Sequence, residues 1–208
     1  MDNIRYGFYM RPSAEMCRAQ AEVHDLLARQ YTLRVAGRFM PHATIKGFFR
    51  SDAEVTELVA AMDANLSDKK PIQISNGGPI AFGTSAIVIN IHHDDLGETN
   101  QALQAFHESA IETLLPFVHP DCNFTPGEWL GPKFHAHLTL AMADVKAQFS
   151  AEVLDFVRDL APIGPAQFIA DTFQLFAFTS PKWSGDWWTE FDWELLHSWR
   201  LGEESSGQ

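Results

Sequence analysis

The sequence lacks the features that place a chain in a membrane or stabilise it through disulfides. Its two cysteines, Cys17 and Cys122, are far apart and form no Cys-x-x-Cys motif, which excludes a disulfide framework. The longest apolar runs, such as residues 86–91, are much shorter than the ~20 residues that a membrane-spanning helix needs. The first residues also lack the basic and then apolar pattern of a secretory signal. We therefore expect a cytoplasmic protein with reduced thiols and no membrane contact.

Basic residues are scarce as well. The 208 residues include 15 Lys and Arg against 27 Asp and Glu, so the formal net charge is −12. Non-specific affinity for nucleic acid comes from a basic surface that neutralises phosphates, so we expect no long nucleic acid as a partner. The sequence also contains no P-loop, no dinucleotide-binding fingerprint, no Gly-x-Ser-x-Gly and no zinc-knuckle spacing.

Hydrophobic periodicity predicts alternating strands and helices along the whole chain. The expected strands are 4–10, 42–49, 72–74, 86–91, 134–142, 168–178 and 189–201. The expected helices begin near Ser13, at a capping box of Ser51 and Glu54, before Leu103 and near Ser150. Residues 76–79 read as a turn, 120–132 as a functional loop and 202–208 as a polar tail.

The unit strand, helix, strand, strand occurs twice, once from His42 and once from His135. This duplication predicts an α+β protein with two pseudo-symmetric lobes, whose mainly antiparallel sheets face a central cleft with the helices outside. No linker separates the lobes, so residues 1–201 are expected to form one bilobal domain.

Each repeated unit opens with the same polar motif, His-x-Thr. The first copy is His42-Ala43-Thr44 and the second is His137-Leu138-Thr139. Side chains two apart on a strand point to one face, so each strand carries an imidazole and a hydroxyl on one side and apolar groups on the other. One such motif is weak evidence, whereas two copies at equivalent places indicate a shared site.

A pair of histidines suits acid–base chemistry at a phosphodiester. Histidine titrates near neutral pH, so one imidazole can remove a proton while its partner delivers one to the leaving oxygen. The threonine hydroxyls can donate to phosphate oxygens as negative charge builds up. This chemistry needs no metal or other cofactor.

The two motifs and the repeat resemble the 2H phosphoesterase superfamily, which includes 2′-5′ RNA ligase-like proteins and cyclic nucleotide phosphodiesterases. The resemblance covers the element order of residues 4–201 and implies a bilobal α+β fold. It makes His42 and His137 the acid–base pair, and Thr44 and Thr139 the phosphate-binding hydroxyls. Family motifs often have Pro directly before the histidine, as Pro41 does here, whereas the second copy has Ala136.

From these features we expect a metal-independent phosphodiesterase that acts on a small 2′,3′-cyclic phosphate or a 2′-5′-linked nucleotide or RNA end. Ligation of 2′-5′ ends is the reverse of the same reaction, and the order of the two histidines as acid and base stays open. One alternative is a non-catalytic nucleotide-binding module with the same cleft. Another is a metal-dependent hydrolase that uses His135 and His137, with His92, His93, Asp94 and Asp95 nearby. The protein is expected to be a monomer.

Further residues are candidates for binding the substrate. Lys46 is expected to share the face of His42, and Lys133 and His135 precede the second motif. The stretch between Leu26 and Ser51 holds five basic residues and no acidic one, so the site is expected to be locally basic. Three tryptophans near the last strand either pack on the core or stack on a base: Trp183, Trp187 and Trp188.

Overall fold

The computed structural model describes residues 3–122 and 131–202, so most of the expected loop 120–132 and nearly all of the tail 202–208 lie outside the described residues. Within them the α-helices are α1 (Ala14–Tyr31), α2 (Val55–Leu66), α3 (Gln101–Leu114) and α4 (Ser150–Asp159). The strands are β1 (Ile4–Arg11), β2 (Ala43–Phe49), β3 (Ile72–Ser75), β4 (Pro79–Phe82), β5 (Ala86–Asn90), β6 (His137–Ala141), β7 (Gln167–Ala170), β8 (Thr172–Thr179) and β9 (Asp192–Arg200).

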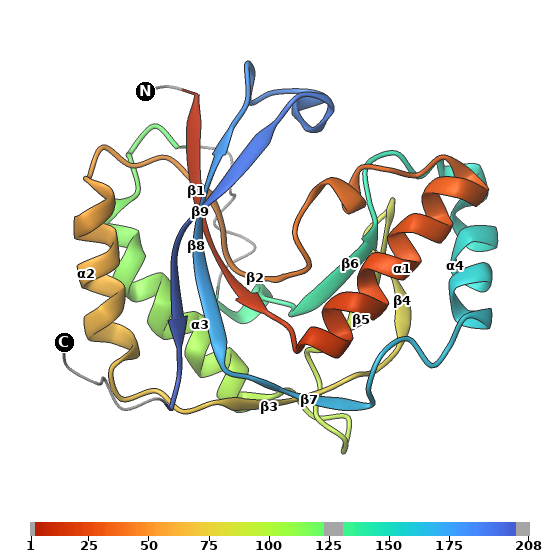
Figure 1. Cartoon of the computed structure of the whole chain (residues 1–208), viewed down its shortest axis with the longest axis horizontal. Helices are drawn as coiled ribbons and strands as arrows, with labels where there is room; N and C mark the ends of the chain where they lie inside the picture. Colours follow the sequence, from red (N-terminus) through yellow and green to blue (C-terminus); the bar gives the residue numbers. More distant parts are fainter. Residues whose placement is uncertain (1–2, 123–130, 203–208) are drawn as a thin grey trace.

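A seven-stranded antiparallel sheet in the order β4-β5-β6-β2-β1-β8-β9 spans the molecule. Its two halves meet between β6 and β2, which share a single registered pair, Ala43 with Leu138. Beyond that pair the strands diverge, so the sheet divides into β4-β5-β6 and β2-β1-β8-β9 (Figure 1). The predicted α+β fold with two lobes of mainly antiparallel sheet is confirmed.

The helices lie on the outside of the two halves. Helices α1 and α4 contact β6 and β4, whereas α3 and α2 contact β2 and β9 (Figure 1). Strands β3 and β7 are two of the segments that cross between the halves, and they pair with each other in a separate two-stranded sheet. This paired crossing joins the halves at the base of the molecule, away from the open side (Figure 1).

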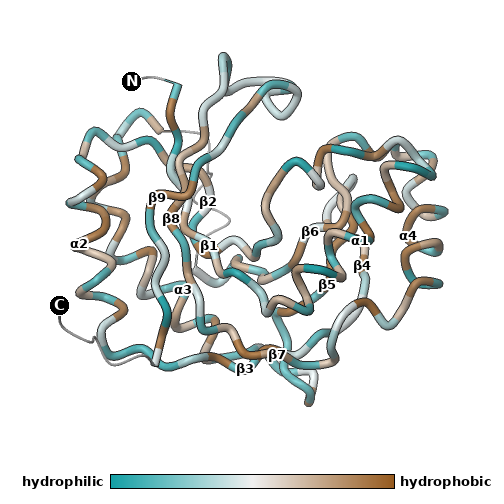
Figure 2. Tube along the Cα trace, in the orientation of Figure 1, coloured by the Kyte–Doolittle hydropathy of each residue, from teal (hydrophilic) through white to brown (hydrophobic). Residues whose placement is uncertain are grey.

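The helices pack through apolar faces whose spacing the sequence predicts. Helix α1 buries Met16, Val23 and Leu27, and the hydroxyl of Ser13 caps it by accepting a hydrogen bond from the Met16 amide. One extended core includes residues of both halves, and apolar residues occur along nearly every element of the trace (Figure 2). A second, smaller cluster lies around Tyr9, Phe176, Phe178 and Phe191.

Two helix starts differ from the prediction. Helix α2 begins three residues late, because its capping box is formed by Glu54 and Glu57 instead of Ser51 and Glu54. The Ser51 hydroxyl instead accepts from the amide of Ala53 in the turn before the helix. Ser150 is the first residue of α4 and makes no capping bond there.

The strands also differ in two places. The predicted turn 76–79 leads into β4, which pairs with β5 at an edge of the large sheet. The predicted single strand 168–178 is two strands in different sheets, β7 and β8, with a change of direction at Asp171. None of the helices among the described residues is long and apolar enough to cross a bilayer.

Candidate active site

The two His-x-Thr motifs meet at the junction of the halves. The middle residues, Ala43 and Leu138, are the registered pair between β2 and β6, and both are buried. Antiparallel geometry at this pair directs His42 toward Thr139 and Thr44 toward His137, although the strands share no further registered pair. Because alternate residues share a face, all four functional side chains lie on one face of the junction, opposite the core.

The two histidines are oriented by the same local bond. In each ring Nδ1 lies 2.7 Å from the carbonyl oxygen two residues earlier, that of Met40 for His42 and that of His135 for His137. A carbonyl can only accept, so Nδ1 carries the proton and donates it. In the neutral imidazole Nε2 then has a free lone pair, which is the state of a general base.

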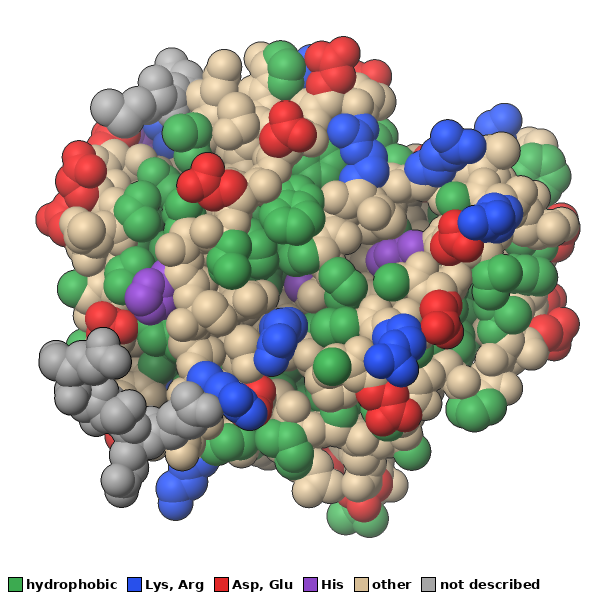
Figure 3. All heavy atoms as spheres, viewed as in Figure 1, with side chains coloured by type: hydrophobic (Ala, Val, Ile, Leu, Met, Phe, Trp, Pro, Cys, Tyr) green, Lys and Arg blue, Asp and Glu red, His purple; other side chains and the backbone are tan. Residues whose placement is uncertain are grey.

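The motif side chains line one cavity of about 400 Å³ between the halves. Histidine side chains are visible in the hollow between the halves in Figure 3. Among the described residues that line the cavity, Lys133 carries the only formal positive charge and none carries a negative one. Most of the wall is aromatic or apolar, and it comprises Tyr9, Ala36, Phe39, Met40, Ile45, Phe48, Phe82, Phe134, Met142 and Trp187.

Burial keeps both motif histidines neutral in the unliganded protein. It lowers the pKa of His42 to about 4, and the hydrogen bond to Met40 only partly opposes this effect, while repulsion from His137 adds to it. Burial likewise lowers the pKa of His137. The repulsion between the rings means that the first proton disfavours a second, so a single proton shared by the site is the favoured charged state.

Helix α1 supplies a support that the motif alone does not predict. The side-chain amide of Gln20 and Nε2 of His24 both donate to the carbonyl of Thr139, each at 2.9 Å. This carbonyl lies where β6 and β2 diverge, beyond their single registered pair. Gln20 and His24 lie one helical turn apart on α1, whose buried face is otherwise apolar. Two polar residues at this spacing are the sequence feature from which this support of β6 could have been predicted.

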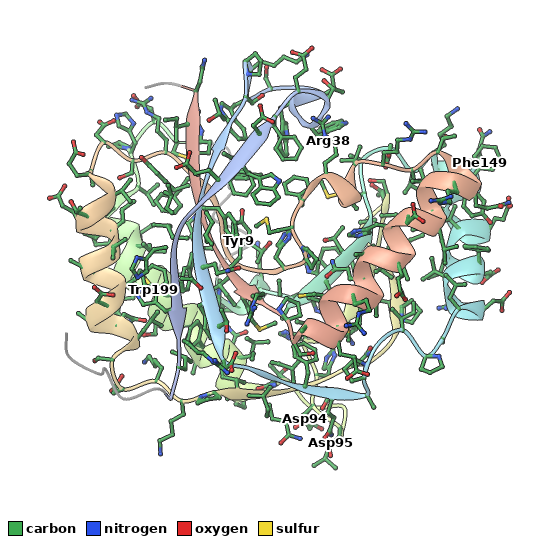
Figure 4. All side chains as sticks on the ribbon, viewed as in Figure 1. Tyr9, Arg38, Asp94, Asp95, Phe149 and Trp199 are labelled. Carbon is green, nitrogen blue, oxygen red and sulfur yellow. The ribbon has the colours of Figure 1, made fainter. Side chains whose placement is uncertain are left out.

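Tyr9 is another cavity residue that the sequence did not single out. It is the register partner of Thr44 on β1 and therefore shares the cavity face. Its ring meets the His42 ring edge-on with centroids 4.8 Å apart. It lies beside the cavity in Figure 4, where it is labelled.

Lys46 does not share the face of His42, and this prediction is wrong. The register passes from Tyr9–Thr44 to Phe8–Lys46, one step on β1 and two on β2, so Ile45 is an extra residue in β2. The bulge reverses the alternation, and Lys46 is buried at 3% exposure over the Phe49 ring, where its Nζ donates to the Gly47 carbonyl. Lys46 is absent from the described lining of the cavity.

Lys133 and His135 do line the cavity. Lys133 is brought there by the short turn Gly131–Lys133, whose Gly131 amide donates to His107. His135 stacks on Phe82 with centroids 5.4 Å apart and lies tilted against His92 at 4.6 Å. Burial and the neighbouring histidines His137 and His93 lower its pKa, so it too is neutral in the unliganded protein.

The expected local excess of positive charge does not reach the cavity. Arg29 pairs with Asp25 at 2.7 Å, and Arg50 lies 3.8 Å from Asp52. Arg38 binds main-chain carbonyls, and Lys46 is buried. Of the three tryptophans near the last strand, Trp187 lines the cavity, whereas Trp183 packs beside it with ring centroids 5.4 Å apart.

The alternative of a metal site at His135 and His137 has no third ligand in the described part of the chain. No group of three His, Cys, Asp or Glu side chains there is arranged to hold a metal ion. His92, His93 and His135 contact one another through their rings, and Nδ1 of His93 is bonded to the Asn90 amide. Asp94 accepts from the amides of Leu96 and Glu98 in its own loop.

The fold and the site together define an α+β protein with two lobes and a His-Thr pair from each lobe at one cleft. The model of the 2′-5′ RNA ligase superfamily matches residues 13–179 of this chain. The chain therefore belongs to this superfamily of 2H phosphoesterases.

Solved structures of similar fold agree with this assignment. The structure of LigT from E. coli complexed with NADP+ has a TM-score of 0.55 at 13% identity, with 97% of this chain and 99% of that chain covered. The protein TT0787 of Thermus thermophilus has a TM-score of 0.58 at 17% identity, with coverage of 95% and 97%. At these identities the likeness shows the fold alone. A comparison with curated proteins gave no match.

Proposed function

We propose that this chain is a metal-independent phosphodiesterase that hydrolyses a small 2′,3′-cyclic phosphate or a 2′-5′-linked nucleotide or RNA end. The observation that carries the proposal is the matched orientation of His42 and His137. Each ring donates Nδ1–H to a carbonyl two residues earlier, and both rings line the same cavity as Thr44 and Thr139. This pattern leaves two Nε2 atoms free to move protons.

The reaction needs one imidazole as base and the other as acid. The base Nε2 removes a proton from water, and the water oxygen forms a bond to phosphorus. The bond from phosphorus to the ribose oxygen breaks, and that oxygen takes the proton from Nε2 of the second imidazolium. Thr44 and Thr139 donate to the two non-bridging oxygens, where charge accumulates. A bound phosphate monoanion favours the one proton that this scheme requires, because it offsets the repulsion between the rings.

The size and lining of the cavity support a nucleotide as substrate. A volume of about 400 Å³ lies in the range of small-molecule sites. Its aromatic wall suits stacking on a base, and Lys133 and His135 are the further side chains that we assign to binding. LigT, which shares the fold, has been crystallised in complexes with 3′-AMP, NADP+ and phosphate.

The test is hydrolysis of adenosine 2′,3′-cyclic phosphate and of a 2′-5′-linked dinucleotide, in the presence of EDTA. The loss of either catalytic group is expected to lower kcat by about 100-fold or more, in His42→Ala and in His137→Ala. His197→Ala is a matched control, because His197 lies on β9 against Trp199 outside the cavity and should keep wild-type turnover.

Each other outcome favours a different function. Full activity in either catalytic variant contradicts the acid–base assignment. Loss of activity with EDTA favours metal-dependent hydrolysis. Tight nucleotide binding in calorimetry without turnover of either substrate favours a non-catalytic binding module. The monomeric state, the cytoplasmic location and the direction of the reaction stay predictions.

A further inference from the structure

The segment between α1 and β2 carries part of the cavity wall and orients His42. It contains a short 3-10 turn, η1 (Ala36–Arg38), and its residues Phe39, Met40 and His42 line the cavity. The Met40 carbonyl is the acceptor for Nδ1 of His42. The direction in which Nε2 of His42 points therefore depends on where this segment is held.

A second segment forms an adjoining part of the wall. The loop 180–191 joins β8 to β9 and contains the 3-10 turn η6 (Trp187–Thr189). Trp187 of this turn lines the cavity. The loop and the segment after α1 are about 150 residues apart in the sequence, so only tertiary contacts relate Trp187 to His42.

Arg38 makes most of the polar contacts between these two segments. Its Nη1 donates to the carbonyl of Trp188 at 2.9 Å and to that of Thr189, and its Nη2 lies 3.4 Å from the carbonyl of Phe191. Its guanidinium lies 5.0 Å from the centre of the Phe191 ring. In return, the indole N–H of Trp193 donates to the carbonyl of Arg38 at 2.9 Å. Arg38 is labelled beside this loop in Figure 4.

The next residue transmits this contact to the cavity. The Phe39 ring lies 4.5 Å from Phe191, 6.2 Å from Trp187 and 5.9 Å from His42, measured between ring centroids. A shift of Arg38 relative to the loop would therefore move Phe39, and with it both the aromatic wall and the acceptor of His42.

The chemistry of these contacts requires arginine. A planar guanidinium presents several N–H donors in a fixed fork and can contact three carbonyls at once, whereas a lysine ammonium is a point charge on a flexible stem. These contacts use both N–H groups of Nη1 and one of Nη2, and Arg38 is absent from the described lining of the cavity, so we assign it to the main chain and not to the phosphate.

We propose that Arg38 is a positioning residue that holds His42 and Trp187 in a fixed relation in the wall of the cavity. The kinetic part of this proposal rests on the proposed phosphodiesterase function, and the structural part does not. His137 provides an internal reference, because it has the same Nδ1–H bond to a carbonyl in the other half, where no described residue plays the part of Arg38.

The experiment compares wild type with Arg38→Met, Arg38→Lys and the control Arg34→Met, an exposed arginine four residues earlier. Nuclear magnetic resonance follows the imidazole Nδ1–H signals of His42 and His137, which are assigned with His42→Gln and His137→Gln. Fluorescence of Trp187, assigned with Trp187→Phe, reports the loop. Kinetics are measured on a nucleoside 2′,3′-cyclic phosphate and on a cyclic phosphodiester without a base.

In both Arg38 variants we expect the His42 Nδ1–H signal to broaden or disappear through exchange with water, while the His137 signal stays sharp. Trp187 emission should shift to longer wavelength. We expect kcat to fall about 10- to 100-fold on both substrates, because small displacements of a catalytic group are costly. KM should rise only for the substrate that has a base, and Arg34→Met should match wild type.

An unchanged His42 signal with unchanged kcat in both Arg38 variants would overturn the proposal. Equal loss of both histidine signals together with a lowered melting temperature would assign Arg38 a general structural role instead. If wild type turns over no substrate, the phosphodiesterase function fails, while the histidine signals and the fluorescence still decide whether Arg38 positions His42.

Discussion

At the level of single side chains, the site repeats one arrangement in each half of the molecule. Each motif histidine bonds to a carbonyl two residues earlier, and each motif threonine lies two residues later on the same face. The supports around this arrangement differ between the halves. Tyr9 packs edge-on against His42, whereas Phe82 lies tilted over His137 with centroids 4.5 Å apart.

Gly7 allows Tyr9 to take its position beside His42. A Cβ at residue 7 would lie 2.3 Å from the Tyr9 hydroxyl and 2.5 Å from its Cε2, which is closer than non-bonded atoms approach. Tyr9 is 3% exposed and packs against Phe178, so its ring cannot move freely. We expect Gly7→Ala to destabilise the protein by about 1–3 kcal/mol and to lower kcat, as measured by denaturant unfolding and by turnover.

A double-mutant cycle isolates the Tyr9 contact. Tyr9→Leu removes the ring atoms that a new Cβ would meet, so the added cost of Gly7→Ala should largely disappear in the Tyr9→Leu background. Strictly additive destabilisation by the two substitutions would contradict this explanation.

The low pKa of His42 predicts how ligand binding depends on pH. Burial lowers the pKa to about 4 in the folded protein, below the value of about 6.5 in an unfolded chain. Between these values the unfolded chain binds more protons, so stability falls as the pH decreases from 6.5 toward 4. A bound anion raises the pKa of the imidazole, and a proton is then taken up on binding.

Sulfate is a suitable probe because it stays a dianion throughout this range. We expect it to raise the melting temperature more at pH 5.5 than at pH 7.5, compared with chloride at equal ionic strength. In His42→Gln, the rise in melting temperature caused by sulfate should differ less between pH 5.5 and pH 7.5 than it does in wild type. An equal effect of sulfate at both pH values would contradict the assigned proton uptake.

Among the secondary structure elements, β2 shows how far periodicity predicts a site. Alternation placed His42 and Thr44 on one face correctly, because the first residues of the strand are regular. It failed at Lys46, because the bulge at Ile45 depends on the pairing of β2 with β1, which the sequence of β2 alone does not reveal. Periodicity also does not predict the break between β7 and β8 at Asp171, because the break depends on a tertiary contact. The Asp171 side chain accepts hydrogen bonds from Thr172 and from Arg200, and Arg200 is distant in the sequence.

Buried Lys46 should cost stability near neutral pH. Burial lowers its pKa to about 8, below the usual 10.5. Between pH 8 and 10.5, Lys46 is therefore protonated in the unfolded chain but largely neutral in the folded protein. Below pH 8 it is protonated in both states, and the full cost of burying its charge lowers the free energy of unfolding. We expect Lys46→Met to raise the free energy of unfolding by up to about 3 kcal/mol at pH 7.

The pH dependence of this gain is the specific test. The advantage of Lys46→Met should decline as the pH rises from 8 to 10.5, because the wild-type lysine becomes neutral in the folded protein. Urea unfolding at pH 7, 9 and 10.5 measures it, with exposed Lys70→Met as the control. A gain that is equal at all three pH values would show that packing, and not charge, is responsible.

For the molecule as a whole, the net charge of −12 and the sparse cationic lining of the cavity limit what binds. Of the basic residues near the first motif, Arg29 is paired, Lys46 is buried and Arg38 is bound to carbonyls, and Lys133 is the one lysine or arginine in the described lining. The threonine hydroxyls and histidines can hold one phosphate without a strong positive field. The acidic remainder of the surface would repel the further phosphates of a long strand.

This distribution predicts that affinity does not increase with the length of RNA. We expect a single-stranded 30-mer to compete with adenosine 2′,3′-cyclic phosphate no better than a dinucleotide with the same end. The logarithm of the binding constant for the 30-mer, plotted against the logarithm of the salt concentration, should have a slope close to that for one phosphate contact. Competition experiments between about 50 and 200 mM salt measure this slope. A 30-mer that binds more tightly with a steep salt dependence would show that the surface outside the cavity contacts phosphates. In that case net charge would be a poor guide to the substrate size of this protein.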